Sequence, residues 1–389
     1  MVDIEKLRSN AVLIEDLRRK ARKRLPRIVY DWLDGGAGDE RALEVNRRQY
    51  ASYGLLPRYL AALEGLSTTT AIFGKTYAMP YGISPTGFGD LCWPGAELML
   101  ARAAASAQIP FVLSGAGIVA LEKAAAASQG FMWYQLYPTR DPRITDDLVR
   151  RAAAAGVETL VVTVDLPVAS RRPRDIRNGF GLPPRLGIGL IWDGLSHPGW
   201  TMRFYRNGGV PLMENWVAYA PRGASKGAVA RLASQHYHAA QTWDDVAAYR
   251  RLWQGNLVLK GIQHVEDAAR ALSHGVDGII VSNHGGRQFD KALGTLATLT
   301  QVVDRVGDRM IVMLDGGIRS GSDAVVALAL GARLVFSGRC TLYGISAYGE
   351  AGCMRAIEII REGIEETLMQ IGCPQIAGLN RDFVRERPA

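Results

Sequence analysis

Residues 310–317 read Met-Ile-Val-Met-Leu-Asp-Gly-Gly, an apolar run that ends in an acid and two glycines. A run of this length, bounded by turn residues, is typical of a strand that is buried on both faces. Seven more runs of this kind occur between residues 80 and 337, and helical patterns such as Ala96–Ala107 and Val265–His274 separate most of them. The eight runs are Pro80–Ser84, Pro110–Ser114, Phe131–Leu136, Thr159–Val164, Leu257–Lys260, Gly278–Ser282, Met310–Leu314 and Leu334–Ser337.

This alternation decides the fold class. Eight strand–helix units without hairpin signals between them predict a closed parallel α/β barrel, the (β/α)8 or TIM barrel. The alternative, a doubly wound open sheet, is disfavoured by the number of strands. Residues 1–75 have helical and irregular patterns, so we interpret them as an N-terminal helical segment that caps the barrel. We expect residues 1–389 to form a single domain.

The composition limits the possible partners. The chain is 48% hydrophobic, which allows a large buried core, and Lys and Arg outnumber Asp and Glu by 46 to 38. This charge suits an anionic substrate, a phosphorylated cofactor, an anionic membrane surface or nucleic acid. No nucleic-acid-binding motif or metal-binding spacing accompanies this charge, so we expect neither a nucleic acid nor a metal ion as a partner. No signal peptide, spanning stretch or C-x-x-C pair is apparent, which favours an intracellular protein.

The connection between the fourth and the fifth strand is far longer than one helix requires. Residues 176–235 form an insertion with seven basic residues against two acidic ones, together with several tryptophans and tyrosines. Loops of this length are usually functional. We therefore interpret this insertion as part of the functional surface.

Every predicted strand is followed directly by polar or charged residues. In a barrel these strand ends share one mouth, which is where active sites occur. Two of the ends, Asp315–Gly321 and Gly338-Arg339, combine glycines with an arginine and so predict a phosphate-binding site. Two tight turns with surface arginines are the structural alternative. The strand-end residues are Ser84-Pro85-Thr86-Gly87, Ser114-Gly115, Gln135, Tyr137, Thr163, Asp165, Lys260-Gly261, Ser282-Asn283-His284, Asp315-Gly316-Gly317 and Ser337-Gly338-Arg339.

The segment Ser282–Arg287 is the sharpest of these motifs. A histidine on a glycine-rich turn, His284, can approach a ligand closely and accept a proton near neutral pH. Arg287 can form a bidentate pair with a carboxylate. Asp165, at another strand end, could orient the imidazole, and a buried Lys260 would need a negative partner such as an electron-rich ring or a phosphate. We interpret the other five histidines as structural.

These motifs resemble those of the FMN-dependent α-hydroxy acid dehydrogenases and oxidases. The resemblance covers nearly the whole chain, and the string Ser282–Gln288 is very specific. Within the family, the stretch Arg24–Asp31, the Pro85-Thr86-Gly87 turn before Trp93-Pro94, and the tail Ile371–Pro374 are most similar to (S)-mandelate dehydrogenase. The resemblance implies the same barrel, FMN as cofactor, and oxidation of an (S)-2-hydroxy acid, mandelate-like or lactate-like, to the 2-keto acid.

The resemblance also implies a role for each matching position. His284 would remove a proton from the substrate with the support of Asp165, and Lys260 would stabilise the reduced flavin. Catalytic and substrate-binding roles would fall on His284, Asp165, Tyr137, Arg172, Arg287 and Tyr30. The remaining cofactor contacts would be Pro85, Thr86, Gly87, Ser114, Gln135, Thr163, Ser282, Asp315, Gly316, Gly317, Arg319, Gly338 and Arg339.

Other expectations follow from the resemblance. Pro173 follows Arg172 where the family usually has an acidic residue, so the carboxylate loop can differ. Gly87 favours a dehydrogenase over an oxidase that uses O2 and releases H2O2, which is the first alternative; a phosphate-binding isomerase or lyase is the second. The insertion 176–235 takes the place of the family's membrane-binding segment, and the alternative is a soluble lid or an oligomer contact. We thus expect peripheral attachment to the cytoplasmic side of the inner membrane, a quinone-type electron acceptor, and a homotetramer.

Overall fold

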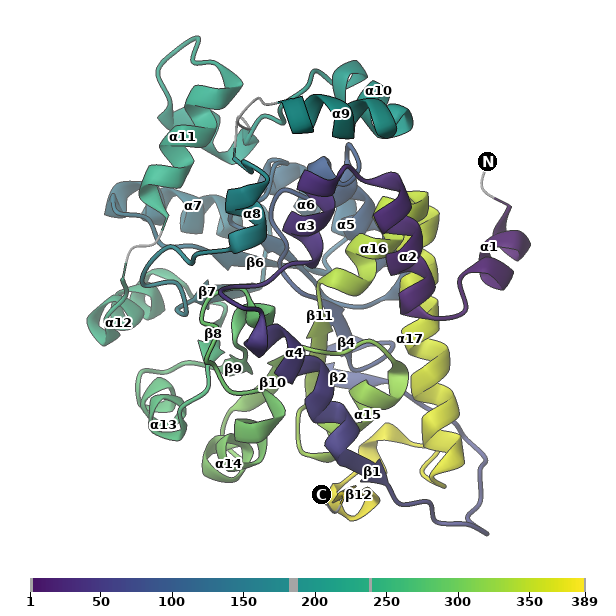
Figure 1. Ribbon diagram of the computed structural model, residues 1–389. Helices are drawn as coiled ribbons and strands as arrows, with labels where there is room; N and C mark the ends of the chain where they lie inside the picture. Colours follow the sequence, from purple (N-terminus) through teal and green to yellow (C-terminus); the bar gives the residue numbers. More distant parts are fainter. Residues whose placement is uncertain (1–2, 182–187, 238–239, 388–389) are drawn as a thin grey trace.

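The computed structural model describes residues 3–181, 188–237 and 240–387. Its centre is a closed barrel of eight parallel strands in the order β10-β11-β4-β5-β6-β7-β8-β9 (Figure 1). Because Val335 of β11 pairs with Tyr81 of β4, the sheet has no open edge, and the predicted TIM barrel is confirmed. The strands are β4 (Tyr81–Ile83), β5 (Phe111–Ser114), β6 (Met132–Leu136), β7 (Thr159–Thr163), β8 (Asn256–Ile262), β9 (Gly278–Val281), β10 (Ile311–Asp315) and β11 (Leu334–Ser337).

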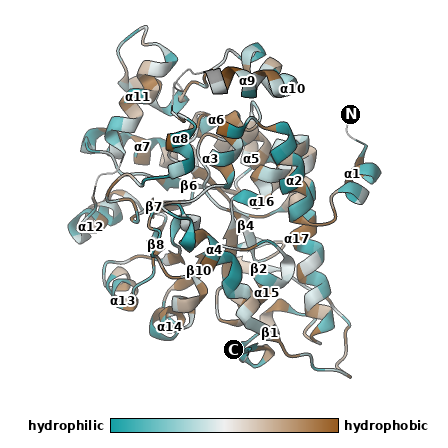
Figure 2. Cartoon of the chain, in the orientation of Figure 1, coloured by the Kyte–Doolittle hydropathy of each residue, from teal (hydrophilic) through white to brown (hydrophobic). Residues whose placement is uncertain are grey.

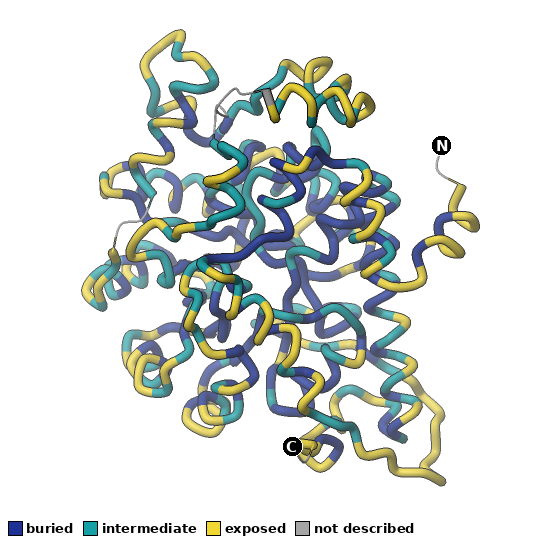
Figure 3. Tube along the Cα trace, in the orientation of Figure 1, coloured by how far each residue is buried: buried dark blue, intermediate teal, exposed yellow. Residues whose placement is uncertain are grey.

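Helices surround the barrel, and the strands divide the buried core into two parts. Inside the strands lies a cluster that includes Val161, Val258, Ile280 and Met313, all fully buried. Outside the strands a larger apolar layer joins the barrel to the helices, so the centre of the molecule is buried and the helix tips are exposed (Figure 3). The surrounding helices are α5 (Ala96–Ala107), α6 (Leu121–Ser128), α7 (Pro142–Ala154), α12 (Trp243–Leu252), α13 (Val265–Ser273), α14 (Leu296–Val306), α15 (Gly321–Ala329), α16 (Arg339–Tyr348) and α17 (Glu350–Gln370).

The N-terminal segment is helical as far as residue 52 and mostly irregular over residues 56–69, and it also contains short strands that the sequence patterns did not predict. Strand β1 pairs with the C-terminal β12, and β2 pairs with β3 in a hairpin whose Ile72 and Tyr77 join the cluster inside the barrel. Local patterns did not reveal these strands because each has three residues. The elements are α1 (Ile4–Asn10), α2 (Ile14–Arg24), α3 (Arg27–Asp34), α4 (Arg41–Arg48), η1 (Gln49–Ser52), β1 (Tyr53–Leu55), β2 (Thr70–Ile72), β3 (Lys75–Tyr77) and β12 (Val384–Glu386).

The insertion between β7 and β8 is a set of short helices. Proline occupies the first position of two of them, where its missing N–H costs nothing. In Figure 1, α9 and α10 lie over the end of the molecule that contains α3, α5 and α6. The indole of Trp200 donates to the carbonyl oxygen of Leu91 at 2.7 Å, and the Arg203 guanidinium lies 4.2 Å from the ring centre of Trp93, so α10 is attached to the loop after β4. The helices are α8 (Pro173–Arg177), α9 (Ile188–Ser196), α10 (Pro198–Arg206), η3 (Glu214–Tyr219) and α11 (Lys226–His236).

Candidate active site at the mouth of the barrel

A cavity of about 480 Å³ opens at the carboxyl ends of the strands. We call the residues that follow the strands its floor. We call the residues from α3, α8 and the insertion its cover, which includes Trp32, Leu33, Arg172, Phe180, Met213 and Tyr237. The predicted site residues that line the cavity are Pro85, Thr86, Gly87, Tyr137, Arg172, Lys260, His284, Arg287, Asp315, Gly316, Gly317, Arg319, Gly338 and Arg339.

Other predicted residues lie buried directly behind the lining. The Ser114 hydroxyl donates to Oε1 of Gln135 at 3.0 Å, which joins the ends of β5 and β6. The Ser282 hydroxyl accepts hydrogen bonds from Nζ of Lys260 at 2.7 Å and from the backbone N–H of His284 at 3.0 Å. These residues therefore fix the orientation of the side chains that face the cavity.

The structure does not bring Tyr30 to the cavity. Its hydroxyl lies beside Asp34, and burial together with that negative charge raises the pKa of Tyr30. Trp32, two residues further along α3, lines the cavity instead. Residues two apart on a helix lie on nearly opposite faces, so Tyr30 and Trp32 cannot both face the cavity. The resemblance assigned the role to Tyr30, and only tertiary packing identifies the face that carries Trp32.

His284 and Asp165 form a pair across the mouth. Nδ1 of His284 lies 2.9 Å from Oδ1 of Asp165, and Nε2 lies 3.4 Å from the Tyr137 hydroxyl. Gly261 is required at its position, because its φ is +108° and an added Cβ would lie 2.6 Å from Cβ of Asp165. The pair thus presents Nε2 of His284 at the cavity, and the second ring nitrogen is held by a carboxylate.

The surroundings of His284 favour its neutral form. Burial lowers the pKa of the imidazole, and the positive charges of Lys260 and Arg172 lower it further, against the raising effect of Asp165. The carboxyl of Asp165 is fully enclosed, which opposes its charge, but the interactions with His284 and Lys260 lower its pKa. Near neutral pH this arrangement keeps a base available at Nε2.

Two arginines make the same cavity strongly positive. Burial and the charges of Arg172 and Arg339 lower the pKa of Arg287 well below its usual value. Nη1 of Arg287 donates to the carbonyl oxygens of Trp32 at 2.6 Å and Gly35 at 2.9 Å. Among the described residues, no acceptor is found for Nη2 of Arg287 or of Arg172. The pair is therefore suited to bind a carboxylate in the cavity.

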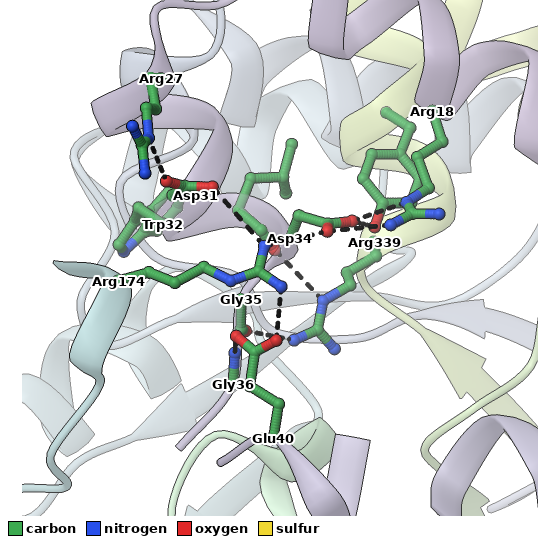
Figure 4. Close-up of polar contacts among 12 residues, drawn as sticks. Arg18, Arg27, Asp31, Trp32, Asp34, Gly35, Gly36, Glu40, Arg174 and Arg339 are labelled. Atoms are coloured by element: carbon green, nitrogen blue, oxygen red, sulfur yellow. Dashed lines mark hydrogen bonds and ion pairs between the residues drawn. The ribbon is translucent and has the colours of Figure 1, made fainter. Parts of the chain in front are cut away.

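The two arginines of the predicted phosphate site have different contacts in the structure. Arg319 lines the cavity next to Gly316 and Gly317. The guanidinium of Arg339 instead donates to the carbonyl oxygens of Leu33 at 3.1 Å, Gly285 at 3.0 Å and Gly35 at 2.8 Å. Figure 4 shows the Arg339 guanidinium bound to the turn after α3, at Gly35. Arg319 and the backbone N–H groups at the start of α16 are therefore suited to bind a phosphate, whereas the Arg339 guanidinium already has three backbone acceptors.

Unpaired polar atoms show that the residues present fit FMN. Buried polar atoms normally have hydrogen-bond partners, yet several around the cavity have none among the described residues. Lys260 pairs with Asp315 at 2.8 Å, which places a buried ammonium group at the floor. This ammonium, the unpaired atoms and the anion site at Arg319 suit a polar heterocycle with a phosphate tail. The unpaired atoms are Thr86 Oγ1, Gln135 Nε2, Thr163 Oγ1 and Asp315 Oδ1.

Comparison with known proteins agrees with this chemistry. A family model described as FMN-dependent dehydrogenase matches residues 21–386. (S)-Mandelate dehydrogenase of Pseudomonas putida is 40% identical over 97% of this chain and 94% of that protein. A putative L-lactate dehydrogenase of Mycobacterium tuberculosis is 41% identical over 95% of this chain and 88% of that protein.

Solved structures give the same result. A crystal structure of the monotopic membrane protein (S)-mandelate dehydrogenase matches with a TM-score of 0.93 and 39% identity, covering 97% of this chain and 100% of the other. A structure of mandelate oxidase with (S)-4-hydroxymandelic acid matches with a TM-score of 0.81 and 36% identity, over 95% of this chain and 97% of the other. We conclude that the chain belongs to the family of FMN-dependent dehydrogenases and is an FMN-dependent 2-hydroxy acid dehydrogenase.

Proposed function

We propose that this protein oxidises an (S)-2-hydroxy acid with an aryl side chain, mandelate-like rather than lactate-like, and passes the electrons to a quinone or another membrane acceptor. The observation that carries the proposal is the His284–Asp165 pair, which faces the same cavity as Arg172 and Arg287. One carboxylate-binding pair beside one base is the minimum that this reaction requires.

Each side chain has a defined task in this proposal. Arg172 and Arg287 bind the substrate carboxylate and so fix the hydroxyl-bearing carbon in the cavity. His284 accepts a proton at Nε2, and Asp165 stabilises the resulting imidazolium at Nδ1. Bound FMN supplies the two-electron acceptor. Lys260, buried at the floor, balances the negative charge that develops there.

An aromatic wall supports an aryl side chain on the substrate. Trp32 and Phe180 are stacked, with ring centres 5.7 Å apart and planes 10° apart, and Phe88 contacts Trp32 edge-on at 6.2 Å. All three residues line the cavity. Aromatic rings gain affinity from such walls beyond the area that they bury, whereas a methyl group as in lactate does not.

Anaerobic bleaching of the bound flavin by a panel of (S)-2-hydroxy acids tests the proposal. We expect mandelate to bleach the flavin faster than lactate. We also expect His284→Ala to retain the flavin but to lose at least ~10²-fold in reduction rate, since a positioned base contributes about that much. A variant that reduces as fast as the wild type would contradict the role of His284. Peroxide release that matches substrate consumption in air would favour the oxidase alternative.

Peripheral membrane attachment is the second part of the proposal. Among the described residues we find no helix with the length and hydropathy of a bilayer span. Helices α9 and α10, however, leave large apolar side chains exposed, and α9 is predominantly hydrophobic (Figure 2). Apolar and aromatic side chains beside Arg206 suit an anionic membrane interface, and the cytoplasmic side of the inner membrane would give access to quinone. The exposed side chains are Ile191, Trp192, Leu195, Met202 and Tyr205.

Vesicle binding tests this attachment. We expect the wild type to cosediment with phosphatidylglycerol vesicles, and the triple change Ile191→Ser, Trp192→Ser and Leu195→Ser to abolish cosedimentation without loss of flavin. Leu293→Ser, at a leucine outside the insertion with similar exposure, is the control. Equal binding of the triple variant and the wild type would contradict the proposal.

Residues 182–187 of the predicted membrane-binding segment lie outside the described residues. The homotetramer stays a prediction.

A further inference from the structure

Three carboxylates lie together at the end of α3 and in the turn that follows it. We call Asp31, Asp34 and Glu40 the acidic cluster. Nη1 of Arg174 lies 3.5 Å from Asp31 and 3.5 Å from Asp34, and Nη2 donates to Glu40. Figure 4 shows the Arg174 guanidinium between these carboxylates, reaching across from α8. One arginine of α8 thus bridges three acids of the N-terminal segment.

Arg174 is only two residues from Arg172, which lines the cavity. Between them, Pro173 begins α8, and Arg172 is the residue that caps it. A five-residue helix has little stability of its own, so contacts with its neighbours must fix its position. A second contact ties its other end to the same cluster, because the amide of Asn178 donates to Asp31 at 2.7 Å.

Arg172 needs such support because its surroundings repel it. It shares the cavity with the buried Arg287 and Arg339, and the three positive charges oppose one another. Its own anchors are weak: Nε donates to the carbonyl oxygen of Arg287 at 3.2 Å, and Nη1 lies 3.9 Å from Asp175. Repulsion among these charges favours an outward displacement of Arg172 and α8 unless other contacts hold the helix in place.

We propose that Arg174 is a positioning residue that clamps α8 to the acidic cluster and thereby holds Arg172 where the substrate carboxylate binds. This role rests on the proposed function, since it acts through the carboxylate contact of Arg172. It assigns the acidic cluster a task in substrate affinity rather than in the chemistry, because neither Arg174 nor the cluster's side chains line the cavity.

The test separates affinity from rate. For Arg174→Met we expect KM for (S)-mandelate to rise about tenfold while kcat changes less than about twofold. The reason is that the variant weakens binding of the carboxylate equally in the ground state and in the transition state. Binding of phenylacetate, a carboxylate without the reacting hydroxyl, should weaken by the same factor when followed by the absorbance of the bound flavin. Flavin content should be unchanged.

Further variants distinguish clamping from a merely structural effect. Arg174→Lys and added guanidinium ions should each restore part of the affinity, and Glu40→Gln, which keeps an acceptor for the N–H of Gly36, should raise KM by a smaller factor. Arg177→Met, on the same helix and without an ion pair among the described residues, is the control and should match the wild type. An unchanged KM in Arg174→Met, whether or not kcat and flavin content fall, would overturn this role. A wild type that oxidises no 2-hydroxy acid would overturn the proposed function itself.

Discussion

The floor and the cover of the cavity are built in different ways. Floor residues follow strands whose register is fixed by backbone pairing, as where Asp315 of β10 pairs with Phe336 of β11. The cover is held by side chains that reach across from other segments, as where Arg287 donates to the carbonyl oxygen of Trp32. The backbone ladder makes the floor rigid and the cover adjustable. We therefore expect floor changes to affect chemistry and cofactor, and cover changes to affect substrate choice.

The largest effect should come from the floor at Asp165. Asp165→Asn leaves the shape intact but can no longer stabilise an imidazolium at Nδ1 of His284. Flavin reduction by (S)-mandelate should slow by about 10²–10⁴-fold at unchanged flavin content, as measured anaerobically by stopped flow. Asp267→Asn, an exposed change on α13, is the control. A variant within tenfold of the wild type would show that His284 works without its partner.

The next largest effects distinguish the roles of two arginines, both of which the sequence predicts to bind the phosphate. Arg319→Met should weaken FMN binding by about 10–100-fold, because it removes a charge-assisted contact to the phosphate. Arg339→Met should lower the melting temperature of the protein but should change FMN affinity less than Arg319→Met does, since its guanidinium binds three backbone carbonyls. Flavin fluorescence titration and thermal melts measure both quantities, with the exposed Arg333→Met as control. If Arg339→Met weakened FMN binding more than Arg319→Met does, the assignment of Arg319 to the phosphate and of Arg339 to the cover would be wrong.

A smaller effect should come from the cover at Trp32. Trp32→Ala removes the stacked partner of Phe180 and should lower kcat/KM for (S)-mandelate about tenfold or more, with a smaller change for lactate. Tyr30→Phe, on the opposite face of α3, should leave both values close to those of the wild type. Steady-state kinetics with both substrates measures the ratio. A larger loss in Tyr30→Phe than in Trp32→Ala would restore the original assignment to Tyr30.

What the sequence could predict follows the same division. The eight strands, the strand-end positions of His284 and Asp165, and the glycine-rich turns depend on local patterns, and the structure places them at one mouth. The identity of the cover does not depend on local patterns. Whether Tyr30 or Trp32 faces the cavity depends on how α3 is rotated. The contacts of Arg339 depend on the carbonyl oxygens of Leu33 and Gly35, which are 306 and 304 residues away in sequence. Such contacts leave no signal in one sequence.

A buried acid beneath the floor shows one more residue that the sequence did not indicate. Glu97 of α5 is 1% exposed, and its Oε2 accepts from the N–H groups of Ile118 at 2.7 Å and Val119 at 2.9 Å. Burial and the nearby charge of Asp90 raise the pKa of Glu97 to about 8. A carboxyl group that stays protonated in the folded protein is thus attached to the loop after β5.

This pKa predicts the smallest effect, a pH dependence of stability. The folded pKa of Glu97 lies above the ordinary value of 4.5, so its contribution is full below pH 4.5 and is lost as the pH rises toward 8. Glu97→Gln removes this titration but keeps an acceptor for the two N–H groups. Relative to the wild type, the variant should therefore gain about 1 kcal/mol or more of unfolding free energy between pH 5 and pH 8, measured by urea unfolding. The exposed Glu266→Gln should show no such trend. If the difference in unfolding free energy between Glu97→Gln and the wild type did not change with pH, the floor would tolerate the charge of Glu97. The floor would then be less rigid than its backbone ladder implies.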